Sequence, residues 1–310
     1  MNMNKKQRLG QYFSTINPFN DKPLKLWLDK IPNFETQSLL EPFAGNCDIL
    51  NYFPKKKWTC FDIDPIKKNV EYRDTIKDFP IGFDVCITNP PYLAKTVISR
   101  KKEKDIKIKY ADMYLDALEQ CLENCKYVSV IIPSTFIGNS KLKDRCLIID
   151  KIDKVVFEDT SNPVCVAYFV PYKVEKIMTF VDGQQIFLNA NNTPINVSEK
   201  IEFNVSDGNY VLNGVDSKTK TISISNDLKS FNKTKYLKIS SRNYSLFKSN
   251  NINMNSINEF IKKWRKETKD YFLSSFKSPT NSNIVYRKRI SFRQLKWIIK
   301  KHDNTLDNHF

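Results

Sequence analysis

The chain has 310 residues, of which 41% are hydrophobic and 27% charged, so it can bury one large core or two medium ones. The formal net charge is +16, with only two histidines, His302 and His309, and seven scattered cysteines. These numbers exclude a disordered chain and argue against a disulfide framework, a structural zinc site and Ser-His-Asp catalysis. No apolar run reaches 18 residues and the first ten residues are polar and basic. We therefore expect a cytoplasmic protein without a membrane span or a secretory signal.

The first half of the chain alternates segments of strand and helix character. Strand patterns occupy residues 38–40, 58–63, 83–88 and 127–132, a helical period covers 110–125, and a hairpin is expected from 154–157 and 164–170. Such alternation is typical of an α/β protein with a parallel sheet. Ligands of these sheets bind at the carboxyl ends of the strands, where we expect the informative side chains.

The second half of the chain lacks this alternation of strand and helix segments and is strongly basic. Short strand-like runs are separated by turn residues, and helices are expected over 257–276 and 292–299. We place the domain boundary near Pro171–Tyr172, which gives domains 1–172 and 173–310. Residues 228–301 hold 19 Lys and Arg against 3 Asp and Glu. A block of this kind usually faces a polyanion, although a lysine-rich surface without such a partner is the alternative.

The most specific pattern is Thr88-Asn89-Pro90-Pro91-Tyr92, which directly follows the strand predicted over 83–88. Two prolines fix φ and remove two backbone donors, so the loop is rigid. It exposes the Asn89 amide, the Pro90 carbonyl and the Tyr92 ring together. These groups suit a flat heteroaromatic ring with an exocyclic amine, because both amine protons find an acceptor and the tyrosine can stack on the ring.

Acidic residues lie at the ends of two predicted strands and before a third. Glu41 ends the first strand and suits an ammonium group, while Gly45 in the turn that follows allows a ligand to approach the backbone closely. Asp62, about 20 residues later, suits a ribose diol. Asp74 precedes the next strand and could bind an adenine amine, although Asp78 is a competing candidate.

These residues in this order resemble the N6-adenine DNA methyltransferases that use S-adenosylmethionine, of the kind found in restriction-modification systems. The segment Gln7–Thr15 resembles the cofactor-tail motif of that family, and its position before the glycine turn resembles the gamma order of motifs. The likeness covers residues 7–170. It implies a Rossmann-like methyltransferase sheet followed by a basic, mixed α+β domain that recognises DNA.

The resemblance also implies a role for each matching residue. Asn89, Pro90, Pro91 and Tyr92 would hold a flipped adenine of double-stranded DNA and carry the catalysis. S-adenosylmethionine would be the cofactor, without a metal, and a separately encoded restriction endonuclease would be a partner. The cofactor would be bound by Tyr12, Phe13, Thr15, Glu41, Phe43, Gly45, Asp62, Ile63, Asp74 and Asn89.

Two positions depart from the family pattern. Cys47 stands where the family usually has a second glycine, which suggests an altered cofactor turn. The family also tends to place a late aromatic residue on the target base, and Phe157 is the candidate here.

Three other functions remain open from the sequence. A protein glutamine methyltransferase could use the same amide loop, but it would not need so basic a second half. An RNA adenine methyltransferase would also use that basic half, and a non-catalytic DNA-binding protein could retain a decayed methyltransferase core.

Within the basic half, Lys262 and Lys266 are candidates for phosphate contacts. The run 287–293 either faces a groove of the nucleic acid or places Ile290 and Phe292 in the core.

Overall fold

A computed structural model describes residues 16–54, 56–95, 109–154, 156–157, 163–198, 200–217, 219–229, 243–277 and 286–306. The chain forms two compact units, Met1–Gln185 and Ile186–Phe310, which are described separately below. None of the helices in these ranges has the length and apolar character needed to span a membrane.

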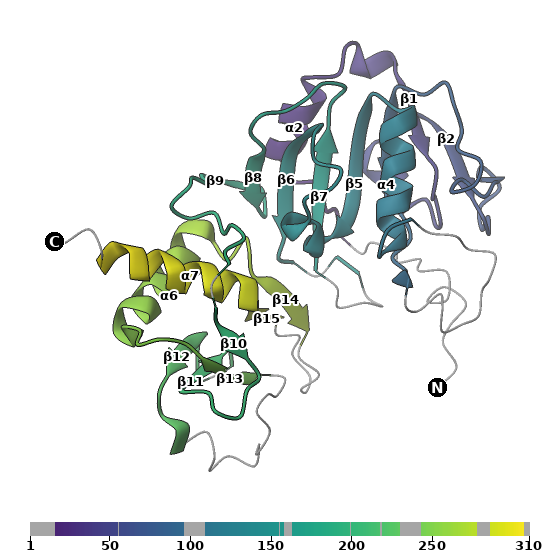
Figure 1. Cartoon of the computed structure of the whole chain (residues 1–310). Coiled ribbons are helices and arrows are strands. Elements are labelled where there is room, and N and C mark those ends of the chain that lie inside the picture. The colour runs from purple at the N-terminus through teal and green to yellow at the C-terminus, as the bar shows by residue number, and fades with distance from the viewer. Residues whose placement is uncertain are drawn as a thin grey trace. The chain divides into compact units, whose positions relative to one another are not determined.

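The first unit is built on a nine-stranded sheet with the order β3-β2-β1-β4-β5-β7-β6-β8-β9 (Figure 1). The five strands from β3 to β5 pair in parallel, β7 is antiparallel to both β5 and β6, and β8 is parallel to β6. The strands are β1 (Ser38–Glu41), β2 (Lys57–Asp62), β3 (Glu71–Tyr72), β4 (Val85–Thr88), β5 (Tyr127–Pro133), β6 (Cys146–Ile152), β7 (Val164–Phe169), β8 (Met178–Val181) and β9 (Gln184–Ile186).

The order of the parallel strands reverses between β1 and β4. Successive strands run outward from β1 through β2 to β3, and then outward in the other direction from β4 to β5. In open α/β sheets, ligands bind outside the carboxyl ends of the strands at such a reversal. The predicted α/β sheet with parallel strands is confirmed, and its reversal point lies where Glu41 and Thr88 end their strands.

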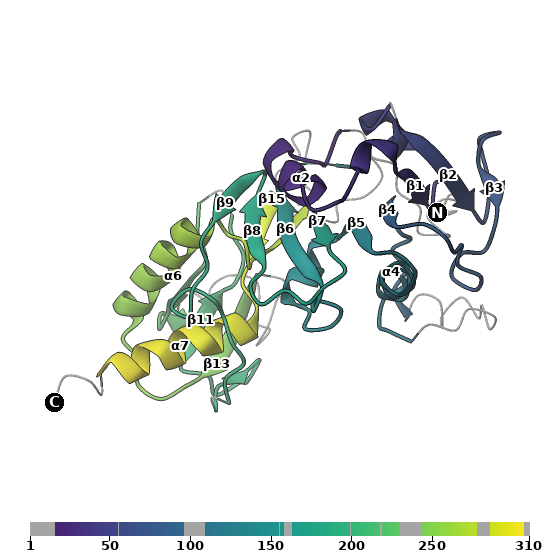
Figure 2. The ribbon, with the colours of Figure 1, turned by 90° about the horizontal axis from the view of Figure 1, so that it is seen from above.

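Two helices lie on opposite faces of this sheet, α2 (Asp21–Leu28) and α4 (Met113–Asn124) (Figure 2). In α2 the buried Trp27 donates its indole N–H to the Phe169 carbonyl, at 2.9 Å. In α4, Leu118 and Cys121 are fully buried, as the helical period predicted. Short 3₁₀ turns cover Phe34–Thr36, Asp48–Tyr52 and Ser134–Gly138.

Two sequence expectations for this unit differ from the structure. The strand that pairs with β7 is Cys146–Ile152 rather than 154–157; it contains the buried Asp150, which accepts hydrogen bonds from Asn20 Nδ2 at 2.7 Å and from the Gly183 N–H at 3.1 Å. The unit also continues past the boundary expected at residue 172, because β8 returns to pair with β6.

The second unit combines antiparallel strands with two helices. Its four-stranded sheet has the order β10-β13-β11-β12, and a separate two-stranded ribbon joins β14 to β15. Trp264, Phe247, Leu295 and Ile298 belong to its apolar core. The elements are β10 (Glu202–Phe203), β11 (Tyr210–Asn213), β12 (Ser223–Ser225), β13 (Tyr244–Lys248), α6 (Met254–Thr268), β14 (Ser274–Lys277), β15 (Tyr286–Arg289) and α7 (Phe292–Leu306).

Both predicted helices exist, but with other ends. α6 stops at Thr268 instead of residue 276, because Lys269 and Asp270 take left-handed φ values of 47° and 56°. α7 continues to Leu306 rather than ending near 299. Ile290 is buried and Phe292 packs against the same core, which is the second of the two alternatives for the run 287–293.

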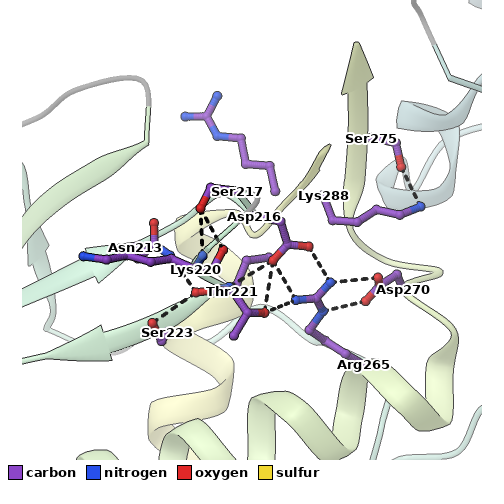
Figure 3. Close-up of polar contacts among 12 residues, drawn as sticks. Asn213, Asp216, Ser217, Lys220, Thr221, Ser223, Arg265, Asp270, Ser275 and Lys288 are labelled. Atoms are coloured by element: carbon purple, nitrogen blue, oxygen red, sulfur yellow. Dashed lines mark hydrogen bonds and ion pairs between the residues drawn. The ribbon is translucent and has the colours of Figure 1, made fainter. Parts of the chain in front are cut away.

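Arg265 of α6 connects three parts of this unit (Figure 3). Its guanidinium donates to both oxygens of Asp216, at 2.9 and 2.7 Å, and to both oxygens of Asp270, at 2.8 and 2.9 Å. The fifth N–H donates to Thr221 Oγ1 at 2.8 Å, so all five donors are used. Burial alone lowers the pKa of Arg265, but the hydrogen bonds and charges of Asp270 and Asp216 outweigh it and raise the pKa above its ordinary value.

Replacement of Arg265 should destabilise the second unit. Arg265→Met leaves two carboxylates facing each other without a counter-charge. Because the arginine side chain is only 16% exposed, we expect the free energy of unfolding to fall by about 2–3 kcal/mol, somewhat less than for a fully buried pair. Chemical unfolding followed by tryptophan fluorescence measures the loss. Lys263→Met is the control, because Lys263 lies exposed on the same helix with a single 3.9 Å pair to Glu267. Equal unfolding midpoints for the two variants would contradict this role.

Candidate functional site

Three strand ends meet at the reversal of the sheet, and each carries a polar side chain. Glu41 is the last residue of β1, Asp62 of β2 and Thr88 of β4. The neighbouring pairs β1–β2 and β1–β4 are both parallel, so these ends lie on one edge of the sheet. All three residues are buried.

Glu41 is more deeply buried than Asp62, with 1% of its surface exposed against 4%. Its Oε1 accepts from Thr88 Oγ1 at 2.5 Å and from the Phe43 N–H at 3.2 Å. Burial raises the pKa of Glu41 to about 8, the negative charge of Asp62 adds to the increase, and the two hydrogen bonds oppose it. Because this value lies above that of an unfolded glutamate, ionisation of Glu41 opposes folding as the pH rises from about 4.5 toward 8.

The turn after β1 brings backbone donors to the end of β2. Gly45, at φ 49°, donates its N–H to Asp62 Oδ2 at 2.8 Å, and the Ala44 N–H donates to the Phe61 carbonyl at 2.9 Å. The Asp64 N–H donates to the other Asp62 oxygen, at 2.8 Å. The carboxylate of Asp62 is therefore fixed in position by the turn itself.

Cys47 adopts the left-handed conformation that a glycine takes without strain, with φ 59° and ψ 30°. A non-glycine residue pays about 1–2 kcal/mol there. Its thiol packs against Ala44, Cys60 and Val70, and this burial offsets part of that cost. The turn thus keeps a glycine-like backbone although the second glycine is absent.

Ile63 and Asp74 lie beside this turn in different environments. Ile63 follows β2 directly and is 45% exposed, an apolar surface that a planar ring could cover. Asp74 pairs with Lys77, with 3.0 Å between Oδ2 and Nζ, while Asp78 pairs with Arg73. The hydroxyl of Thr75 donates to the Pro42 carbonyl at 2.8 Å, which ties the segment after β3 to the turn after β1.

The Asn89–Tyr92 loop leaves the end of β4 next to Glu41. Asn89 is half-buried, whereas Tyr92 is only 8% exposed. The Tyr92 ring makes edge-to-face contacts with Tyr114, at 6.4 Å between centroids, and with Phe157, at 6.1 Å. Phe157 therefore packs against the loop tyrosine, and its contact with a target base stays a prediction.

The structure thus brings together Glu41, Phe43, Gly45, Asp62 and the Asn89–Tyr92 loop at one edge of the sheet. Tyr12, Phe13 and Thr15 lie outside the described residues, as does most of the basic segment 95–109. Sequence reasoning gave no role to Thr88, which joins Glu41 to the loop. The sequence feature that could have indicated this role is the hydroxyl side chain of Thr88 at the last position of β4, the strand beside β1.

In the described part of the chain, no three His, Cys, Asp or Glu side chains gather into a group that could ligate a metal. The buried cysteines there are thiols, and burial raises the pKa of Cys60 and Cys146 to about 12. These two thiols are therefore protonated and inert near neutral pH.

Comparison with solved structures gives distant likenesses. The methyltransferase subunit of a type I restriction-modification system from Streptococcus thermophilus is 15% identical over 59% of this chain and 53% of its own length, with a TM-score of 0.37. The EcoKI M protein, from a type I restriction enzyme, is 13% identical over 54% of this chain and 48% of its own, also with 0.37. The chain thus spans about half of each of these proteins. No curated protein sequence matches it.

The sequence comparison with protein families is more specific. The model of the Eco57I restriction-modification methylase family matches residues 9–163, which is half of the chain. The match contains the turn after β1, the acid that ends β2 and the loop after β4. The chain belongs to the Eco57I restriction-modification methylase family.

Proposed function

We propose that this protein transfers the methyl group of S-adenosylmethionine to the N6 amine of adenine in a specific double-stranded DNA sequence, with the target base flipped out of the duplex. The observation that carries the proposal is the position of Asn89-Pro90-Pro91-Tyr92 at the end of β4, joined to the buried Glu41 through Thr88. Membership of a restriction-modification methylase family supports DNA as the substrate.

The side chains at the three strand ends fit the cofactor. Glu41 would bind the ammonium group of the methionine part, and the fixed carboxylate of Asp62 would accept from the ribose hydroxyls. The exposed Ile63 would lie against the adenine ring, with Asp74 at its amine, while Phe43 and Gly45 would line the turn. By family resemblance, Tyr12, Phe13 and Thr15 would complete the pocket. The cofactor supplies an electrophilic methyl group on a sulfonium ion.

The loop after β4 suits an amine that is a poor nucleophile. The N6 lone pair is delocalised into the purine ring, so the amine must be held in a pyramidal geometry to react. The Asn89 side-chain oxygen and the Pro90 carbonyl would accept its two protons and direct the lone pair toward the methyl group. This is catalysis by positioning and preorganised dipoles, without a covalent intermediate. After transfer the positively charged nitrogen is acidic enough to lose a proton to water.

In a duplex this amine is paired and stacked, which is why base flipping belongs to the proposal. An aromatic ring that receives the flipped base offsets part of the unstacking, by about 1–3 kcal/mol per base. Tyr92 is proposed for this role, with its position set by Tyr114 and Phe157.

The second unit has features of a DNA-binding surface. A groove of about 620 Å³ runs beside α6, and its wall includes the exposed Lys262, Lys266 and Lys269. Arg265 also lines it, but Asp216 and Asp270 hold its guanidinium, so we assign phosphate contacts to the lysines instead. Lysine contacts of this kind give affinity without choice of sequence. A separately encoded endonuclease remains an expectation from the family alone.

Asn89→Ala should abolish methyl transfer while cofactor affinity stays nearly unchanged. The side chain is proposed to act mainly in the transition state, so the loss falls on kcat. Transfer of labelled methyl groups to plasmid DNA, followed by mapping of modified adenines, measures it, and calorimetry measures cofactor binding. Near-normal turnover in this variant would rule out the proposed amine chemistry. Preferential methylation of an RNA of the same sequence would instead favour the RNA methyltransferase alternative.

Cofactor binding should release about one proton at pH 7. The pKa of Glu41 is about 8 in the free protein, so its carboxyl group is mostly protonated at this pH. A bound ammonium favours the carboxylate and lowers this pKa. Calorimetry in buffers with different ionisation enthalpies counts the released protons. Glu41→Gln is the matched control and should bind more weakly without the release; equal release from the variant would show that another group is responsible.

The double variant Lys262→Ala with Lys266→Ala should weaken binding to all duplexes alike. Each lost phosphate contact lowers the slope of log affinity against log salt by about one unit. Fluorescence anisotropy across a salt series measures this slope. Lys263→Ala controls for the loss of charge from the same helix outside the groove. A slope change as large in the control would show that the charge acts diffusely and that the groove is not the phosphate site.

A further inference from the structure

Thr88 is a fully buried threonine at the last position of β4, and its hydroxyl faces the neighbouring strand β1. Its Oγ1 donates to Oε1 of Glu41, the last residue of β1, with 2.5 Å between the two oxygens. The three residues before it, Val85–Ile87, are apolar and equally buried. A hydroxyl group in such surroundings lowers stability unless it has a hydrogen-bond partner. The Glu41 carboxyl is such a partner, so the two strand ends depend on each other.

The carboxyl group of Glu41 is held through one of its two oxygens. The Thr88 hydroxyl donates to Oε1 at 2.5 Å, and the Phe43 N–H donates to the same oxygen at 3.2 Å. The first donor belongs to β4 and the second to the turn after β1, so two separate elements fix the orientation of the group. Oε2 is thereby placed by contacts to the other oxygen, and it is the atom that we assign to a cationic ligand.

The charged and titratable groups around Glu41 come from β2 and from the turn after β1. Burial raises the pKa of Glu41 to about 8, the Thr88 hydrogen bond is the largest contact that opposes this increase, and the negative charge of Asp62 adds to it. Burial also raises the pKa of Cys60 to about 12 and that of Cys47 above its ordinary value, so neither thiol supplies charge near neutral pH. The hydroxyl of Thr88 therefore decides how readily the carboxylate forms.

We infer that Thr88 is a positioning residue for the cofactor: its hydroxyl orients the Glu41 carboxyl group and stabilises the ionised form, so that Oε2 can bind the ammonium group. The identity of the ligand rests on the proposed function, whereas the action of Thr88 on Glu41 does not. A hydrogen bond to a carboxylate is stronger than one to the neutral acid, so the hydroxyl favours ionisation when a cation arrives. Thr88 itself touches neither the cofactor nor the target base.

Thr88→Val removes the hydroxyl and keeps the branched shape of the side chain. The affinity for S-adenosylhomocysteine, which carries the same ammonium group, is measured by calorimetry from about pH 6 to 8.5. In the wild type it should rise with pH, as the carboxylate forms, and level off near pH 8. In the variant this point should move upward by about one pH unit, so that affinity at pH 7 falls about tenfold. A merely structural loss would lower affinity by the same factor at every pH.

Two variants serve as controls. Thr88→Ser retains the hydroxyl and should restore the wild-type pH profile. Thr75→Val removes another buried hydroxyl close to the site, one that donates to the Pro42 carbonyl at 2.8 Å, and should leave the position of the profile unchanged. The inference is overturned by an unshifted profile in Thr88→Val, and equally by a shift of the same size in Thr75→Val.

A second measurement needs no cofactor. In ¹³C-labelled protein, the carboxyl carbon signal of Glu41 is identified by its loss in Glu41→Gln, and its titration midpoint should lie near 8. The midpoint should be higher in Thr88→Val. If that variant does not fold, Thr88→Cys should raise it as well, because a thiol is the weaker donor. Equal midpoints would overturn the inference whether or not the protein methylates DNA. A raised midpoint in a protein that binds no S-adenosylhomocysteine would instead refute the proposed function and leave the action of Thr88 on Glu41 standing.

Discussion

The candidate site depends on one contact between two neighbouring strand ends, the hydrogen bond from the Thr88 hydroxyl to the buried Glu41 carboxyl. β1 and β4 pair in parallel at the point where the strand order reverses, so residues that are 47 positions apart meet at one edge. A carboxyl group with almost no exposed surface needs partners, and its surroundings supply a hydroxyl and one backbone N–H. The same contact fixes the residue that immediately precedes Asn89, and the amide loop therefore starts from a rigid strand end.

The second unit also contains an ionisable side chain that is largely buried, but there the surrounding side chains balance its charge. Arg265 is only slightly exposed, but all five of its donors reach acceptors on three residues, and two carboxylates balance its charge. An arginine in that state stabilises the unit and has no donor left for a phosphate. Positive charge that could meet a polyanion therefore comes from other, exposed side chains of the unit, such as Lys262 and Lys266. Net charge predicts the class of partner, whereas burial decides which side chains can meet it.

The sequence predicted those features in which residue type and local order determine the structure. Strands β1, β2, β4 and β5 followed from their apolar runs, and the meeting of the acids that end β1 and β2 followed from the geometry of parallel sheets; the two-residue strand β3 was not predicted. β6 was missed because Asp150 and Lys151 interrupt its apolar run, and only tertiary partners such as Asn20 and Gly183 make the buried aspartate tolerable. The end of α6 was missed for a similar reason. Arg265 holds Asp270 in a left-handed turn, and no glycine lies near it to indicate in the sequence that the helix ends there.

Unfavourable features in the first unit are concentrated where the cofactor is proposed to bind. Glu41 is buried with a strongly raised pKa, and Cys47 holds a left-handed backbone that favours glycine. Each lowers the stability of the free chain; Glu41 ends β1, and Cys47 lies in the turn that follows it. Features of this kind persist when the surrounding structure enforces them, and they occur preferentially at ligand sites. A cationic ligand at Glu41 would remove the larger of the two costs, since it would supply a counter-charge that none of the described residues places there. The turn after β1 is thus better suited to the bound state than to the free one, which is the property expected of a binding site rather than of a structural turn.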